Sequence, residues 1–158
     1  MVIVSCSAIG LSAKKYLSSR KNTLKSFIVA FQTVRSEILY RNADIPTLTE
    51  LVCTHCGGTA AQFFDMIMSE GYSVMSSFNK NILFLKNAGL TDEDLSRIKE
   101  ALFVLGRYDG SLQAERLENS IKSMENALSG IADEEVNKGK IYTALGITVG
   151  IMLVILLI

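Results

Sequence analysis

The residues best suited to chemistry are two cysteines three positions apart, in the segment Cys53-Thr54-His55-Cys56. Such a group could bind zinc or cycle between thiols and a disulfide. A structural zinc site needs four ligands, and outside this segment the chain offers only Cys6, because His55 is its one histidine. A thioredoxin-like site would need a preceding strand, which the sequence does not predict. We therefore interpret both cysteines as packing residues and predict no metal or cofactor, with a metal shared between chains and a membrane thiol protein as alternatives.

No other group of residues predicts catalysis. Gly57-Gly58 lacks the pattern and the following lysine of a phosphate-binding loop, so we interpret it as a helix break. The acidic run Asp92-Glu93-Asp94 is explained by a favourable interaction with a helix dipole. Because the single histidine already lies on a short predicted helix, no Ser-His-acid arrangement is available. We predict a protein that is not an enzyme and has no small-molecule substrate.

Both ends of the chain are apolar, which predicts attachment to a lipid bilayer. Residues 141–158 carry no charge and, as a helix, are long enough to cross about 30 Å of hydrocarbon. Residues 1–13 are also uncharged but are shorter than a full span. Their positive charge follows the apolar part, at Lys14 and Lys15, whereas in a signal peptide it comes first. We therefore expect residues 1–13 to be an uncleaved, reversed membrane anchor.

Basic residues flank both apolar segments on the side that faces the middle of the chain: Lys14, Lys15, Arg20, Lys21, Lys138 and Lys140. The positive-inside rule then places residues 14–140 in the cytoplasm and both chain ends on the opposite side. A basic first helix could also contact nucleic acid. The apolar ends favour a membrane surface instead, so we predict no nucleic-acid partner.

Between the apolar segments the sequence predicts only helices. Residues 14–41 carry an apolar stripe at spacings of three and four, made of Leu24, Phe27, Phe31, Val34 and Ile38. Pro46 suits the first turn of a second helix that reaches Cys56. We expect a third helix around Phe63 that stops near Gly71, and a less regular one over 73–85. A fifth helix follows Thr91, which can cap it together with Asp94, and Gly106 ends it.

A long last helix is predicted from the turn at Asp109-Gly110 to the end of the chain. It carries a heptad seam made of Ala114, Leu117, Ile121, Met124, Leu128 and Ile131. Such a seam packs against an antiparallel partner, and we expect the partner to be the helix over 14–41. The predicted fold is an all-α antiparallel bundle whose last helix continues into a membrane span. In that span Gly146 and Gly150 lie one turn apart and would let a second membrane helix approach closely.

Several short motifs from residue 90 onward can be compared with known families: Leu90-Thr91-Asp92-Glu93-Asp94, Leu105-Gly106-Arg107-Tyr108-Asp109, Gln113, Leu117, Asn137-Lys138-Gly139-Lys140-Ile141-Tyr142, Leu145-Gly146, Gly150 and the apolar end Val154–Ile158. Together they resemble the stage III sporulation protein AB family. The helix that ends before Pro46 matches the first cytoplasmic helix of that family more loosely. Family members usually begin with a full membrane span, whereas this chain begins with a shorter apolar segment.

The resemblance implies a role that composition does not show. Members look like the platform proteins of type II secretion and type IV pilus machines, and belong to a channel-like complex between mother cell and forespore. It implies a non-catalytic platform in the mother-cell membrane around the forespore, with its helical domain in the mother-cell cytoplasm. The implied partners are a cytoplasmic ATPase, stage III sporulation protein AA, and other membrane subunits. For docking we single out Leu105, Gly106, Arg107, Asp109 and Gln113, at the turn that also contains Tyr108.

Two alternatives stay open at the level of sequence. The turn could be a simple junction between two helices, in which Arg107 and Asp109 only cap and pair. The whole chain could be a generic tail-anchored adaptor that is unrelated to sporulation and needs only residues 141–158 in the membrane.

Overall fold

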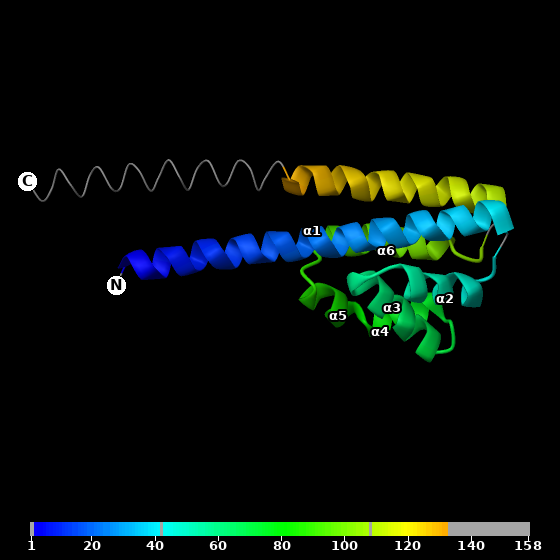
Figure 1. Cartoon of the computed structure of the whole chain (residues 1–158), viewed down its shortest axis with the longest axis horizontal. Coiled ribbons are helices and arrows are strands. Elements are labelled where there is room, and N and C mark those ends of the chain that lie inside the picture. Colours follow the sequence, from blue (N-terminus) through cyan, green and yellow to red (C-terminus); the bar gives the residue numbers. More distant parts are fainter. Residues whose placement is uncertain (1, 42, 108, 133–158) are drawn as a thin grey trace, which may run out of the picture.

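The computed structural model describes residues 2–41, 43–107 and 109–132, with side chains from Lys15 onward. All regular structure in these residues is helical, which confirms the predicted all-α class (Figure 1). The helices are α1 (Val2–Arg41), α2 (Ile45–His55), α3 (Gly58–Ser69), α4 (Val74–Lys80), α5 (Ile82–Asn87), α6 (Asp92–Val104) and a further helix over 110–132. We call the last of these the C-terminal helix.

The long helices α1 and the C-terminal helix lie side by side and antiparallel (Figure 1). Arg35 Nη2 is 2.6 Å from Glu118 Oε2, and Gln32 Nε2 donates to Glu125 Oε1 at 3.1 Å. The residue number falls on α1 as it rises on the partner, so the predicted antiparallel pair is confirmed. Its seam residues are buried except Leu128, which is partly buried: Ala114, Leu117, Ile121, Met124, Leu128 and Ile131.

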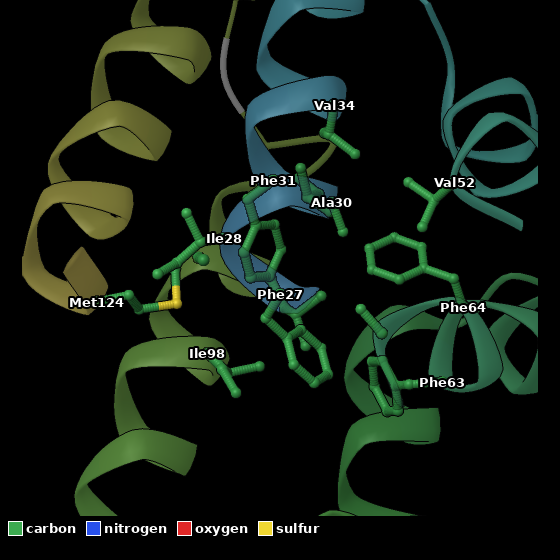
Figure 2. Close-up of a cluster of buried hydrophobic side chains, with 14 of the residues drawn as sticks. Phe27, Ile28, Ala30, Phe31, Val34, Val52, Phe63, Phe64, Ile98 and Met124 are labelled. Carbon is green, nitrogen blue, oxygen red and sulfur yellow. The ribbon is translucent and has the colours of Figure 1, made fainter. Parts of the chain in front are cut away.

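The apolar surface of α1 is wider than the predicted stripe. Besides the five predicted residues, Ile28 and Ala30 are buried. On one side the ring of Phe27 lies 5.8 Å from that of Phe63, between centroids. Figure 2 shows Met124 on the other side of α1, near Ile28. The helix therefore has two partners at once, the short helices α2–α5 on one side and the C-terminal helix on the other.

Glycine ends α3 at the predicted place. Gly71 has φ +80°, a left-handed conformation that glycine adopts without a steric penalty. The N–H of Gly71 donates to the Met68 carbonyl, and the N–H of Tyr72 donates to that of Ile67, which together form a Schellman motif. The third predicted helix is therefore confirmed, and it begins at Gly58, the second glycine of the predicted break.

The single helix predicted over 73–85 is wrong. The chain forms two short helices, α4 and α5, which meet at Asn81. The side-chain amide of Asn81 donates to the Ser77 carbonyl and to the carboxylate of Glu70, the residue that caps the end of α3. These bonds favour a break at Asn81, and a periodicity argument does not detect them.

The N-terminus of α6 carries the predicted capping box, and it also contacts α1. Thr91 Oγ1 accepts from the Asp94 N–H, and Asp94 Oδ2 accepts from the Thr91 N–H. Asp94 is completely buried and receives Arg20 in a bidentate pair, with Nε to Oδ2 at 2.6 Å and Nη2 to Oδ1 at 3.0 Å. Nearby, a Cβ on Gly89 would come within 3.1 Å of the Arg20 backbone nitrogen, so only glycine allows this close approach.

No helix among the described residues is both long and apolar enough to cross a membrane. The described part of the chain thus gives no support to a span in residues 1–13, and α1 continues without a break through the predicted boundary at residue 14. Residues 141–158, with Gly146 and Gly150, and the flanking Lys138 and Lys140 lie outside the described residues.

The seam of the C-terminal helix can be tested with neighbouring charges. Ile121→Asp places a carboxylate at a position that is 4% exposed, and should lower the free energy of unfolding by several kcal/mol. Lys122→Asp changes an exposed position on the same helix and should cost roughly 0.5 kcal/mol. Chemical denaturation of both variants, followed by circular dichroism, measures the difference. Equal stability of the two variants would contradict the packing described above.

A second pair of variants tests the buried carboxylate. Burial opposes ionisation of Asp94, but hydrogen bonds from Arg20 and Thr91 outweigh it and lower the pKa of Asp94. Asp94→Asn should cost about 3 kcal/mol at neutral pH because it leaves Arg20 without its countercharge. The exposed Asp92→Asn is the control and should change stability little.

The pH dependence follows from the direction of that shift. A lowered folded-state pKa stabilises the native state above the unfolded value of about 3.9, and the contribution is lost as the pH falls through the folded-state pKa. The stability difference between the parent chain and Asp94→Asn should therefore be constant above about pH 5 and shrink in stronger acid. A difference that does not depend on pH would show that the charge of Asp94 is not what stabilises this contact.

Candidate docking surface

The predicted docking turn connects α6 to the C-terminal helix. Two of its five singled-out residues, Leu105 and Gln113, are buried and belong to the packing of the bundle. Gly106, Arg107 and Asp109 are exposed. The structure thus separates the predicted set into a buried frame and an exposed part, and of the exposed residues only Arg107 and Asp109 offer charged side chains to a partner.

The shape of the turn depends on Gly106, which has φ +76°. An added Cβ at this position would lie 2.9 Å from Ile45 Cδ1, so the turn packs closely against the start of α2. After the turn, the N–H of Gln113 donates to the Asp109 carbonyl at 2.9 Å and starts the C-terminal helix. Tyr108, which the sequence placed in this turn, lies outside the described residues.

Arg107 makes a contact that the sequence analysis did not predict. Its Cζ lies 3.8 Å from the centroid of the Phe103 ring, a cation–π arrangement. No ion pair joins Arg107 to Asp109, although both are described. The two residues therefore do not pair with each other, although Asp109 directly precedes the C-terminal helix, at the position of a cap. The aromatic ring holds the guanidinium on the surface, and at an exposed site this contributes roughly 0.5–1 kcal/mol.

A groove of about 760 Å³ lies next to the turn, between α6 and the C-terminal helix. Its lining consists of Glu100, Phe103, Val104, Leu112, Glu115, Arg116, Asn119, Ser120 and Ser123. Phe103 and Leu112 are each 42% exposed. This groove was not predicted, although the sequence contains a signal for it. Both residues are large and apolar, yet neither belongs to the buried stripe of its helix.

Cys53 and Cys56 are half-buried and make packing contacts. Cys53 Sγ lies 3.8 Å from the Ala61 carbonyl oxygen, and Cys56 Sγ lies 3.7 Å from Thr33 Oγ1. Burial, with smaller effects of Asp65 and Cys56, raises the pKa of the Cys53 thiol. A raised pKa keeps the thiol protonated, and the protonated form is neither a good nucleophile nor a metal ligand. These contacts favour the packing interpretation over redox chemistry.

Comparison with known families decides what kind of bundle this is. A family model described as stage III sporulation protein AB matches residues 1–158. The chain belongs to the stage III sporulation protein AB family. Membership confirms the resemblance inferred from the motifs after residue 90, and it implies a role in sporulation. It also excludes the generic adaptor that is unrelated to sporulation.

A solved structure supports the fold. The protein titled "Stage III sporulation protein AB (SpoIIIAB)" superposes with a TM-score of 0.63, over 75% of this chain and 98% of that chain. Its sequence is 14% identical, so the likeness shows the shared fold alone. None of the curated proteins compared matches the chain.

The packing role of the cysteines gives a direct test. The double change Cys53→Ser with Cys56→Ser should leave sporulation nearly intact, because neither thiol contacts a group that needs it chemically. Counting heat-resistant spores in a strain that carries only the variant measures this. A loss of spores at normal protein level would show that the thiols act in function.

Proposed function

We propose that the chain is a non-catalytic membrane platform in a secretion-like channel complex between mother cell and forespore. Its helical bundle would dock a cytoplasmic ATPase that resembles stage III sporulation protein AA. Family membership supports the sporulation role. The uncharged residues 141–158 and the basic residues beside them support anchoring in the mother-cell membrane, with the bundle in the mother-cell cytoplasm.

The course of the two long helices supports the choice of docking surface. Because α1 and the C-terminal helix are antiparallel, the start of α1 and residue 132 point toward the same end of the bundle (Figure 1). The turn over 105–109 lies at the other end, where α1 finishes. If residues 141–158 cross the membrane, this turn lies at the end of the described bundle away from it, beside the end of α1, within reach of a large cytoplasmic partner.

The single observation that carries the proposal is the exposed Arg107–Phe103 contact at that end. Arginine and aromatic residues are enriched among those that contribute most to protein–protein binding. Here a half-exposed ring and a guanidinium held over it form a ready anchor, with Asp109 as an exposed carboxylate beside them. Energy would come from the partner, because this chain has no phosphate-binding loop.

Charge reversal at the turn tests the docking. Arg107→Glu should weaken retention of the co-expressed ATPase by at least about tenfold, because a like-charge or unpaired contact in an interface costs more than about 1.4 kcal/mol. The measurement is co-purification of the ATPase with the tagged full chain from membranes. Spore counts of the same strains show whether docking matters for sporulation.

The matched control is Lys99→Glu, the same charge change at an exposed position of α6. It should retain the ATPase at the level of the parent chain. Equal loss in both variants would show a general electrostatic effect. Unchanged binding by Arg107→Glu would show that the turn is not the docking surface.

A further inference from the structure

The short helix α5 carries the most exposed large aliphatic side chain of the described residues, Leu83, which is 70% exposed. Lys86 lies one turn later on the same face of α5, and Lys80 ends α4 just before the break at Asn81. Both lysines are exposed. An exposed apolar side chain beside lysines is typical of surfaces that contact lipid headgroups, because the apolar part enters the layer while the ammonium groups stay at the phosphates.

Hydrogen bonds hold the end of α5 against the first half of α1. The carbonyl oxygen of Ala88, which caps α5, accepts from Ser19 Oγ at 3.1 Å and from Thr23 Oγ1 at 2.8 Å. Leu83 is five residues before Ala88, so it lies within about 8 Å of this contact along the helix. Figure 1 shows α5 as the short helix nearest the start of α1. Residues 19–23 of α1 therefore set the position of Leu83 along the bundle.

The same helix leads from this contact to the uncharged start of the chain. Because α1 runs without a break from Val2 to Arg41, residues 2–13 and Ser19 share one axis. Residues 2–13 rise about 18 Å, enough to enter roughly 30 Å of hydrocarbon but not to cross it. Ser19 lies about 9 Å beyond residue 13, and the headgroup layer on each side of a bilayer is roughly 5–8 Å thick. If residues 2–13 enter the hydrocarbon, α5 therefore lies at the outer edge of the headgroups.

The stretch of α1 between the uncharged segment and this contact is strongly basic. Residues 14–25 contain five basic residues and no acidic one. Lys15 and Tyr16 are both exposed, directly before the contact with α5. Tyrosine and lysine are suited to the boundary between hydrocarbon and water, because their apolar parts can lie in the bilayer while their polar ends reach the headgroups. This end of the bundle thus presents positive charge and apolar side chains together.

Acidic residues at the end of α3 and at the start of α6 do not cancel this positive charge. Each has a basic partner, in the pairs Lys80–Glu70, Lys86–Asp92, Arg97–Glu93 and Arg20–Asp94. The lysines of residues 14–25 therefore give an excess of positive charge. The pairs of Lys80 and Lys86 are exposed and weak, and an ammonium group has three donors, so phosphate oxygens can join or replace the carboxylates.

We propose that α5 makes a second contact with the membrane, in which Leu83 enters the headgroup layer of an anionic bilayer and Lys80 and Lys86 bind its phosphates. Charge complementarity favours an anionic surface, and the continuous helix α1 places α5 beside it. The proposal rests on the membrane anchoring that is part of the proposed function. A contact beside the anchor restricts the tilt of the bundle, because α1 alone could lean in any direction. It would keep the turn over 105–109 at a constant height above the membrane.

Quenching of a fluorescent label by spin-labelled lipid tests the contact. The full chain, with Cys6, Cys53 and Cys56 changed to serine, carries a polarity-sensitive dye at Asn87→Cys, an exposed position of α5. It is reconstituted in vesicles of equal parts phosphatidylglycerol and phosphatidylcholine, with a nitroxide on the lipid headgroup. The dye should be quenched, and its emission should shift to shorter wavelength. The same dye at Ser111→Cys, exposed at the other end of the bundle, should show neither effect.

A pair of leucine variants tests the apolar part of the contact. Leu83→Asn should reduce quenching of the dye at Asn87→Cys, because the side chain that enters the headgroup layer is lost. Leu112→Asn, the same change at an exposed leucine near the other end of the bundle, should leave quenching at the level of the parent chain. Circular dichroism of both variants confirms that they fold alike.

A pair of double variants tests the charged part. Lys80→Gln with Lys86→Gln should reduce quenching on α5, because it removes the groups that bind phosphate. Lys99→Gln with Lys122→Gln, the same loss of charge at exposed positions elsewhere, should not. In vesicles of phosphatidylcholine alone, the parent chain should also lose most of the quenching, because the attraction to anionic lipid is absent.

A label inside residues 141–158 separates this proposal from the anchoring on which it rests. A dye at Thr148→Cys should be quenched by a nitroxide on the acyl chain, in the parent chain and in every α5 variant. Quenching at Thr148→Cys with none at Asn87→Cys would overturn the α5 contact and leave the anchoring intact. Absence of quenching at both positions would contradict the anchoring and the α5 contact together.

Two further results would overturn the proposal while the anchor holds. Equal quenching on α5 in vesicles of phosphatidylcholine alone would show that lipid charge plays no part. A shift to shorter wavelength without quenching by lipid would show that protein covers α5, such as a second copy of the chain.

Discussion

The whole bundle depends on α1 burying apolar side chains on two sides at once. Leu24, Phe27, Phe31 and Val34 are completely buried, and each contributes roughly 1.5–3 kcal/mol through the removal of apolar surface from water. None of the short helices α2–α5 is long enough to be stable alone, since isolated helices under about 12–15 residues are marginal in water. They are stable because they pack on α1 and on one another, as the contacts among Phe27, Phe31, Phe63 and Phe64 show. The C-terminal helix completes the core from the other side.

Apolar packing alone does not determine how far one helix slides along another, because it is non-directional. In this bundle polar contacts do so at several heights. The buried pair of Arg20 and Asp94 joins α1 to the start of α6, and Arg35 with Glu118 joins α1 to the C-terminal helix. Loss of the buried pair would destabilise the fold more than loss of the other pair, because it would leave a buried charge at Asp94 without a partner. By holding the start of α6, it also determines where the other end of α6, with Phe103 and the turn over 105–109, comes to lie.

The surface that remains after this packing carries a few exposed apolar side chains among polar ones. Most exposed residues of the long helices are polar, but Phe103, Leu112, Val29 and Leu39 are large, apolar and two-fifths or more exposed. Two of them line the groove, and the other two lie at exposed positions of α1. The turn with Arg107 lies at the end of α6 and the C-terminal helix, and the groove lies along the side of the same two helices.

Much of this protein was determined by the sequence alone, wherever the cause is local. The stripe of α1, the heptad seam of the C-terminal helix, the capping box at Thr91 and Asp94, and the glycine end of α3 all depend on residues within a few turns of one another. The antiparallel pairing of α1 with the C-terminal helix could be predicted because the apolar stripes of these two helices had no other partner of equal length. The family, too, could be recognised from motifs after residue 90.

Tertiary structure alone decided the features that join distant residues. Arg20 and Asp94 are 74 positions apart, and nothing in the capping box indicates that its carboxylate also binds an arginine of the first helix. The break at Asn81 involves a bond to Glu70, and the groove is lined by side chains of both α6 and the C-terminal helix. Hydrophobic periodicity records which face of a helix is buried. It does not record which partner buries that face, and the partner determines where charges meet and where a gap is left.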